Sequence, residues 1–367
     1  MSSHKPCILV APLNWGLGHA TRCIPLIRLL EEQGANVLLA SDGVALHLLR
    51  AEFPHLTAVE LPSYRIRYYT SNMVWNIARQ LPRIFYAIRA EHRMVRHIAD
   101  KYKVKGIISD NRYGCFHEHI KNVILTHQLH VQLPDKIPKW PVNNILHNLL
   151  AKFDRVWVPD LPDAPNLSGL LSHPPPAHLK VDYIAPQSRM QRLRADTQMS
   201  WQKQKTEYDV GVILSGPEPQ RTILEQRLLE QAMMMTDRHF IFVQGKTQER
   251  KEHYFMADHI EMVSFLTSRD LNLLLLSCAA VVCRSGYSSI MDLAVLGLKA
   301  VLIPTPGQTE QEYLARWFSE RNIFATQNQD TLDLETGLKR LPHTNGLQPE
   351  QYTDHLLKNI LQSWLAT

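Results

Sequence analysis

Short apolar runs alternate with amphipathic segments along most of the chain. The first series of runs lies at 7–11, 37–40, 59–61, 106–109, 123–126 and 156–159, where it closes. Such runs predict buried strands of a parallel sheet. Between the first two, Ile24, Ile27 and Leu30 recur at helical spacing, and Gly34 follows them. Strands that alternate with helices predict a parallel α/β domain.

A second series begins after a stretch with no such pattern. Its predicted strands lie at 210–214, 240–243, 261–263, 281–283 and 300–303, with helices at 221–235 and 350–365. Residues 187–205 are polar and lack apolar periodicity, which is typical of an interdomain connection. We therefore predict an N-terminal domain at 1–186, a linker at 187–206, a second α/β domain at 207–347 and a C-terminal helix at 348–367.

The composition fits a globular protein of about two domains. The chain has 367 residues, 45% of them hydrophobic and 20% charged, and a net charge of +5. A mildly basic chain suits an anionic ligand or membrane surface without requiring either. The five cysteines are scattered and form no C-x-x-C pair, so we expect a reduced, cytoplasmic protein. No apolar run approaches the ~20 residues of a membrane span and no signal peptide precedes the first strand, so any membrane contact is expected to be peripheral.

One stretch, residues 284–315, places two strand ends and two helix starts side by side. After the strand at 280–283 comes a tight turn at Ser285–Gly286, and Ser288 or Ser289 is predicted to cap a helix. We expect that helix to stop at Gly297. The next strand ends at Pro304, and the polar loop 308–312 opens another helix.

This arrangement predicts a ligand site, because ligands of open α/β sheets bind beyond the carboxyl ends of the strands. The backbone N–H groups at 285–289 would suit a phosphate. Asp292, one helical turn further on, would accept from ribose hydroxyls, and the amides and carboxylates at 308–312 would suit a sugar. An ordinary βαβ unit with polar loop ends would look similar.

A resemblance favours the ligand site. Gly286, Asp292, Ala294–Pro304 and Glu310–Gln311 resemble the nucleotide-sugar signature of GT-B glycosyltransferases. That group contains the UDP-GlcNAc transferase of peptidoglycan synthesis, the monogalactosyldiacylglycerol synthases and the UDP-glycosyltransferases, and the chain is similar to its family 28-like members. Most relatives carry Glu where this chain has Asp292. The resemblance implies two Rossmann-like α/β domains facing across a cleft, with the last helix crossing back onto the N-terminal domain.

The first strand of the chain runs into a second glycine-containing loop, Gly16-Leu17-Gly18-His19. A dinucleotide-binding fingerprint would need glycine at position 21, where Thr21 stands. Asp42 follows the second strand, so an NAD-type alternative stays open. The loop also resembles the start of the peptidoglycan transferase family.

His19 is the candidate general base of sugar transfer, because a neutral imidazole can accept the proton of an attacking hydroxyl. A structural or helix-capping histidine is the alternative. Asp110, at the end of the strand at 106–109, would orient His19, bind the acceptor or cap a helix. The predicted acceptor-binding residues are Asn14, Gly16, Gly18, Asn111 and Arg112.

The resemblance also implies how the donor is held. Ser215 and Gly216 resemble the loop that touches the donor diphosphate, and Arg284 would balance phosphate charge or form a surface ion pair. The predicted donor-binding residues are Ser215, Gly216, Arg284, Ser285, Gly286, Ser288, Asp292, Gln308, Glu310 and Gln311. The chain has no Asp-x-Asp pair, the motif that generally holds a nucleotide diphosphate through a metal, so we expect no metal and no cofactor.

The segment 64–105 carries ten Lys and Arg against two acids, interleaved with aromatic residues. Basic residues beside aromatics suit an anionic bilayer surface or single-stranded nucleic acid, and a solvated helix face is the plain alternative. We favour a lipid-linked or membrane-proximal acceptor, with the protein peripheral on the inner face of the membrane, over nucleic acid.

Together these observations predict a metal-independent, inverting glycosyltransferase that uses a UDP-sugar to transfer a hexose or N-acetylhexosamine. A nucleotide-sugar 2-epimerase is an alternative within the same fold, although we find no convincing set of additional carboxylates for it. A non-catalytic sugar- or nucleic-acid-binding protein is the alternative from another class.

Overall fold

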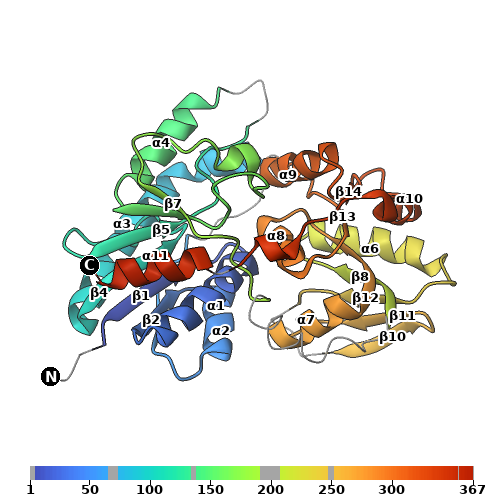
Figure 1. Ribbon diagram of the computed structural model, residues 1–367, viewed down its shortest axis with the longest axis horizontal. Coiled ribbons are helices and arrows are strands. Elements are labelled where there is room, and N and C mark those ends of the chain that lie inside the picture. Colours follow the sequence, from blue (N-terminus) through green and yellow to red (C-terminus); the bar gives the residue numbers. More distant parts are fainter. Residues whose placement is uncertain are drawn as a thin grey trace. The chain divides into compact units, whose positions relative to one another are not determined.

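The computed structural model describes residues 5–64, 73–133, 138–190, 207–246, 252–353 and 355–366. The chain forms two compact units, one from residues 1–188 with 353–367 and the other from 189–352 (Figure 1). Most of the predicted linker, 187–206, and residues 65–72 of the basic segment lie outside the described residues.

The first unit is built on a parallel sheet of seven strands in the order β3-β2-β1-β4-β5-β6-β7. The strands are β1 (Cys7–Pro12), β2 (Asn36–Ser41), β3 (Ala58–Glu60), β4 (Val104–Asp110), β5 (Lys121–Leu125), β6 (Arg155–Val158) and β7 (Val181–Tyr183). The prediction that the series closes at 156–159 was wrong, because β7 pairs with β6. β7 is short and only partly buried, so its sequence lacks the apolar run of a central strand.

Alternate residues of these strands point to opposite faces and bury two layers of helices. The helices are α1 (Leu17–Glu32), α2 (Gly43–Glu52), α3 (Met73–Tyr102), α4 (Trp140–Leu150) and α11 (His355–Ala366), with a short 3-10 helix, η1 (Gly169–Leu171). Ile8 and Val10 pack with α1, α2 and α11, whereas Leu9 packs with α3 on the other face. Pro25 lies inside α1. No described helix combines the length and the apolar character needed to cross a bilayer.

The C-terminal helix α11 packs within the first unit. The rings of Trp364 and Trp157 meet edge to face with centroids 5.7 Å apart. Trp364 also lies directly over Gly106, where an added Cβ would be 2.3 Å from the indole. The helix begins at His355 rather than at residue 350, because the short 3-10 helix η4 (Pro349–Gln351) precedes it.

The second unit contains another seven-stranded sheet, in the order β10-β11-β9-β8-β12-β13-β14. The strands are β8 (Tyr208–Ile213), β9 (Phe240–Val243), β10 (His253–Ala257), β11 (Ile260–Val263), β12 (Cys278–Cys283), β13 (Ala300–Leu302) and β14 (Ala325–Thr326). All pairs are parallel except β10 with β11. The edge strands β10 and β14 were not predicted, since β10 is largely exposed and β14 has two residues.

The helices of the second unit are α6 (Gln220–Met233), α7 (Ser268–Ser277), α8 (Tyr287–Leu296), α9 (Thr309–Glu320) and α10 (Leu334–Arg340), with η3 (Leu341–His343). The prediction that Ser288 or Ser289 caps α8 was wrong. Gly286 is the N-cap, with φ −72° and ψ 140°, and no side chain caps the helix. Gly297 ends α8 in the left-handed conformation as predicted, with φ 68°.

Candidate functional site

In the first unit, candidate residues meet where β1 and β4 end. The two strands pair as far as Pro12 and Asp110, and the Leu13 N–H then donates to the Asp110 carbonyl at 2.9 Å. Gly16 is the N-cap of α1 with φ 83°, a conformation that favours glycine. An added Cβ at Gly16 would meet no atom within 4 Å, so the loop opens onto free space there. His19 follows in the first turn of α1.

Asp110 and His19 form a close pair. His19 Nδ1 lies 2.8 Å from Asp110 Oδ1, and the side chains are 15% and 1% exposed. Burial alone would raise the pKa of Asp110, but Arg22 and His19 outweigh it and hold that pKa at about 2. Arg22 contacts both carboxylate oxygens, with Nε donating to Oδ2 at 2.5 Å and Nη2 donating to Oδ1. Asp110 is therefore ionised at neutral pH.

The ionised carboxylate selects one tautomer of His19. A bare Nδ1 would place a lone pair against a negative oxygen at 2.8 Å, so Nδ1 carries the proton and donates it to Asp110. The lone pair then remains on Nε2. Burial lowers the pKa of His19, Asp110 raises it, and the nearby Arg22 lowers it, with a net decrease. A neutral imidazole held in this way can accept a proton at Nε2. Of the roles predicted for Asp110, orienting His19 matches this geometry.

Two residues of this cluster were not predicted. Arg22 is only 2% exposed, and its Nη1 lies 3.0 Å from Nδ1 of His127, itself 5% exposed. Arg22 stands three positions after His19 on the buried face of α1, and His127 follows the end of β5 by two residues. The sequence signal for Arg22 was a charged residue on the predicted buried face of a helix, where a charge needs a partner. The signal for His127 was a histidine just beyond the end of a strand, at the same sheet edge as His19.

Arg112, predicted to bind an acceptor, is fully buried instead. Its guanidinium donates to Glu91 at 2.5 Å, to Asp42 at 2.6 Å and to the Pro62 carbonyl at 2.7 Å. Asn14 also donates to Asp42, at 3.1 Å. Arg112 is thus occupied by partners within the fold. The same contacts hold Asp42 and leave it 4% exposed, which weighs against the NAD-type alternative.

Asn111 lies at the same strand end. Its backbone has φ 55°, and its N–H donates to the Leu125 carbonyl at 3.3 Å. The side-chain oxygen is buried and has no hydrogen-bond partner within the described part of the chain. Buried polar atoms usually have a protein or water partner. Asn111 is therefore placed to hydrogen-bond water or a ligand close to Asp110.

In the second unit, the end of β12 leads through Arg284 and Ser285 to the N-terminus of α8. Gly286 is partly exposed, and an added Cβ there would meet no atom within 4 Å. Ser288 and Asp292 on α8 are also partly exposed. The first turn of this helix therefore presents backbone N–H groups beside open space, an arrangement that suits an anion.

Arg284 lies beneath this edge. It is 1% exposed, and its guanidinium donates to Gln329 Oε1 at 2.6 Å and to carbonyls of Gln220, Ile303 and Pro304 at 2.8, 3.4 and 3.2 Å. Burial lowers its pKa to about 10. A contact of the terminal nitrogens with a donor phosphate would require these partners to be displaced, whereas Nε has no hydrogen-bond partner among the described residues. The cation instead joins the loops and adds positive potential beneath them.

The loop between β13 and α9 is held by side chains that were predicted to bind the donor. Gln311 accepts from the Thr305 N–H at 2.9 Å and donates to Gln308 at 2.6 Å. Ser285 donates to the Gln311 carbonyl at 2.8 Å. Gln311 and Ser285 therefore fix the loop to the α8 edge, whereas Gln308 and Glu310 stay partly exposed at the start of α9.

Thr305 is a further residue that the sequence did not bring out. It is 2% exposed, and its hydroxyl has no hydrogen-bond partner among the described residues. The hydroxyl lies 4.0 Å from the position of an added Cβ on Gly216, whose φ is 102°. Ser215 and Gly216 themselves are exposed after β8. An unpaired buried hydroxyl costs about 1–3 kcal/mol, so a water or ligand partner is expected here.

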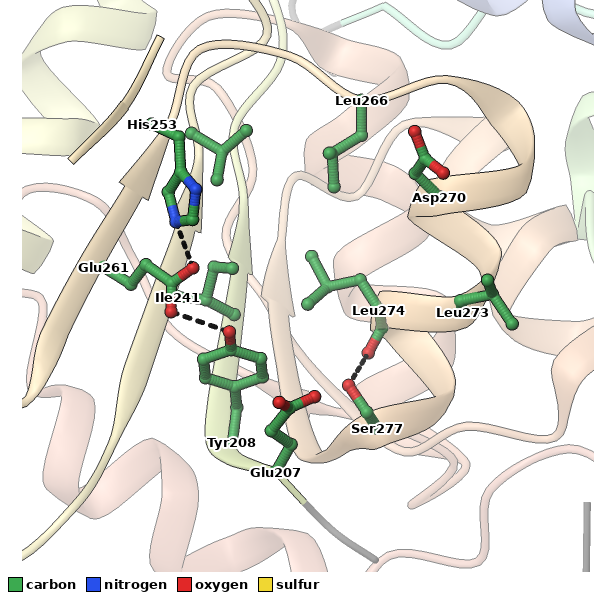
Figure 2. Close-up of a pocket in the computed structure, with 11 residues that line it drawn as sticks. Glu207, Tyr208, Ile241, His253, Glu261, Leu266, Asp270, Leu273, Leu274 and Ser277 are labelled. Carbon is green, nitrogen blue, oxygen red and sulfur yellow. Dashed lines mark hydrogen bonds and ion pairs between the residues drawn. The ribbon is translucent and has the colours of Figure 1, made fainter. Parts of the chain in front are cut away.

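A separate cavity of about 280 Å³ lies along α7 in the second unit. Figure 2 shows the Glu261 carboxylate between Tyr208 and His253, facing leucines of α7. Tyr208 donates to Glu261 at 2.7 Å, and His253 contacts the other oxygen. None of the predicted donor residues lines this cavity. Within the described ranges, no group of three or more His, Cys, Asp or Glu is arranged to hold a metal ion.

The chain is similar to known proteins in its C-terminal part and in its fold. Residues 212–353 match the family model of the glycosyltransferase family 28 C-terminal domain. No curated protein sequence matches the chain. MurG of Acinetobacter baumannii is similar in structure, with a TM-score of 0.61 and 13% identity over 99% of this chain and 100% of that one.

Two further structures were solved with ligands. UGT89C1 of Arabidopsis thaliana, complexed with UDP-L-rhamnose, has a TM-score of 0.64 and 12% identity over the full length of both chains. The spinosyn rhamnosyltransferase SpnG, complexed with thymidine diphosphate, has a TM-score of 0.58 and 13% identity over 98% of this chain and 95% of that one. At such identities the likeness concerns the fold. The GT-B fold is thereby confirmed for the chain, and the predicted resemblance to the family 28-like group is confirmed through residues 212–353.

Proposed function

We propose that this chain, which has a GT-B fold and matches the family 28 C-terminal domain over residues 212–353, is a metal-independent, inverting glycosyltransferase with a UDP-sugar donor. The observation that carries the proposal is the pairing of two sites. The second unit offers the first turn of α8, which begins beside open space at Gly286, and the first unit offers His19 with its proton directed to Asp110. The proposal requires both sites to act on one sugar.

The second unit would hold the diphosphate. Amides at the start of α8 supply hydrogen bonds and the positive end of the helix dipole. Buried Arg284 adds charge from below, and the Thr305 hydroxyl would find the partner it lacks among the described residues. The partly exposed Asp292 would accept from the ribose. The UDP-L-rhamnose and thymidine diphosphate bound to the similar proteins support a nucleoside diphosphate ligand.

The first unit would activate the acceptor. Nε2 of His19 takes the acceptor hydroxyl proton while that oxygen bonds to C1 of the sugar. The bond between C1 and the diphosphate breaks, and its electron pair leaves with the nucleotide. Attack from the face opposite the leaving group inverts C1. The negative charge that develops on the diphosphate would be stabilised by the α8 amides, without a metal ion.

Substitution of His19 tests this proposal. We expect H19A to lower kcat by about 10²–10⁴-fold, the usual share of a general base, while donor affinity changes little. H47A is the matched control, because His47 is an exposed histidine on α2. Equal turnover by H19A and the native chain would contradict the proposed base. Epimerised donor without acceptor would favour the 2-epimerase, and tight RNA binding without sugar transfer would favour the non-catalytic alternative.

We also propose an acceptor at an anionic membrane, because two neighbouring helices of the first unit expose apolar and basic side chains together. Ile84, Ala87 and Ile88 of α3 share a core cluster with Leu149 of α4. The exposed side chains of this α3–α4 surface are Leu81, Phe85, Tyr86, Met94, Trp140, Val142 and Ile145, with Arg79, Arg83, Arg89, Arg93 and Arg96. Aromatic residues beside arginines suit the interface of a bilayer with anionic lipids.

Vesicle co-sedimentation tests this surface. We expect binding to vesicles that contain phosphatidylglycerol, little binding to phosphatidylcholine alone, and release as salt rises. The double variant F85S/Y86S should bind about tenfold more weakly, a loss of about 1.4 kcal/mol. M234S is the matched control, since Met234 is 84% exposed in the second unit. Equal binding to neutral vesicles, or no binding to anionic ones, would remove the membrane from the proposal.

A further inference from the structure

The Arg22 guanidinium lies at the centre of the first-unit site rather than at its edge. It donates to both oxygens of Asp110, and Nη1 lies 3.0 Å from Nδ1 of His127. Nη2 also approaches Nδ1 of His19 at 3.0 Å. One buried cation thus joins both imidazoles of the cluster and the carboxylate between them.

The donor and acceptor properties of these groups determine where the protons lie. A guanidinium has five N–H donors and no acceptor, so Nδ1 of His127 must accept from Arg22 and its proton must be on Nε2. His19 is the opposite case, since its Nδ1 faces the ionised Asp110. The close approach of Arg22 Nη2 to His19 Nδ1 follows from both groups donating to Oδ1.

We propose that Arg22 is a positioning residue that fixes the two imidazoles in opposite tautomers. It donates to Nδ1 of His127, which is therefore protonated on Nε2, and it holds the ionised Asp110, which keeps His19 protonated on Nδ1. This deepens the proposed function and rests on it, because it explains why His19 offers a lone pair at Nε2. In His127 the proton lies instead on Nε2. The two rings therefore differ in which nitrogen can accept a hydrogen bond.

The charges around the cluster agree with a neutral His19 ring. Asp110, Arg22 and His127 interact with His19, and Cys23 on α1 and Tyr113 after β4 interact with Asp110 and Arg22. Burial raises the pKa of the Cys23 thiol and raises that of Tyr113 to about 12, so both stay uncharged. The single positive charge of Arg22 balances the single negative charge of Asp110. A proton added to His19 would leave a net positive charge that is poorly solvated.

Nitrogen NMR of the native chain labelled with ¹⁵N-histidine tests the tautomers without any substrate. Bare and protonated ring nitrogens differ strongly in chemical shift, and the variants H19N and H127N assign the two rings. We expect a protonated Nδ1 for His19 and a protonated Nε2 for His127 at neutral pH. The same tautomer in both rings, or the reverse assignment, would overturn the proposal. The result is independent of turnover, so it can stand even if no sugar transfer is found.

The R22K variant adds a functional readout. Lysine keeps the charge but cannot donate to Asp110 and His127 with a planar fork. We expect His127 to show a mixture of tautomers, kcat to fall by about tenfold or more with donor KM unchanged, and the acid limb of the pH–rate profile to move. A purely structural arginine would lower stability alone and leave the tautomers and that limb as in the native chain, which would overturn the proposal.

Discussion

Substitution of Asp110 by asparagine should destabilise the first unit by an amount that depends on pH. The pKa of Asp110 is about 2 in the folded chain, against an ordinary value of 3.8. Since one pKa unit corresponds to 1.36 kcal/mol, ionised Asp110 contributes about 2 kcal/mol to the free energy of unfolding at pH 7. An asparagine also turns an N–H group toward the donors of Arg22. The full loss should therefore approach the ~3–5 kcal/mol typical of breaking a buried ion pair.

The sign of the pH dependence follows from the lowered pKa. The contribution of Asp110 is fully present above the unfolded value of 3.8 and is lost as the pH falls through about 2. At pH 3 the linkage contribution should have fallen to about half of its value at pH 7. The difference between the native chain and D110N should narrow accordingly as the solution is acidified.

Hydrogen exchange of the amides in β1 and β4 is the suitable assay, because it reports the stability of this sheet rather than of the whole chain. D182N is the matched control. Asp182 pairs with Arg155, whose side chain is 45% exposed, and such pairs contribute about 1 kcal/mol or less. Equal protection in D110N and the native chain at pH 7, or a difference that does not narrow between pH 7 and pH 3, would refute the reasoning.

Three other substitutions test the fold and the loops. G106A should separate α11 from the first sheet, because an added Cβ would lie 2.3 Å from Trp364. We expect faster proteolysis of α11 in this variant, and unchanged proteolysis would contradict that packing. E261Q should lower the pKa of Tyr208, because burial and the Glu261 carboxylate both raise it. An ultraviolet titration that shows no decrease in this pKa would contradict the contact between the two side chains. G16A should lower the free energy of unfolding by about 1–3 kcal/mol, because Gly16 has φ 83° and ψ 173°, a region that essentially only glycine adopts. An unchanged denaturation midpoint would contradict that strain.

The central strands were predictable because they are buried on both faces. β1, β2, β4, β9 and β12 appear in the sequence as short apolar runs, and each was placed to within a few residues. The strands that escaped prediction, β7, β10 and β14, lie toward the edges of their sheets and are short or exposed. Edge strands bury less surface, so their sequences carry a weaker apolar pattern.

The candidate site was predictable in position but less so in the roles of charged residues. His19 and Asp110 were expected at one sheet edge, because the carboxyl ends of parallel strands share that edge. Arg112 and Arg284 could face either a ligand or the interior. Partners that are distant in the sequence, such as Glu91 and Gln329, determine which of the two occurs. Local sequence does not encode such contacts. The same reason kept Arg22 from the predicted site, since its partner Asp110 is 88 positions away.

The most direct test of the donor site is hydrogen exchange of the native chain with and without a UDP-sugar. Bound ligand stabilises the amides that it contacts and those that open with them. The account predicts protection at 285–289 and at 305–311, with no comparable change around the cavity lined by Tyr208 and Glu261. Absence of protection by any nucleoside diphosphate sugar, or protection confined to other parts of the second unit, would contradict it.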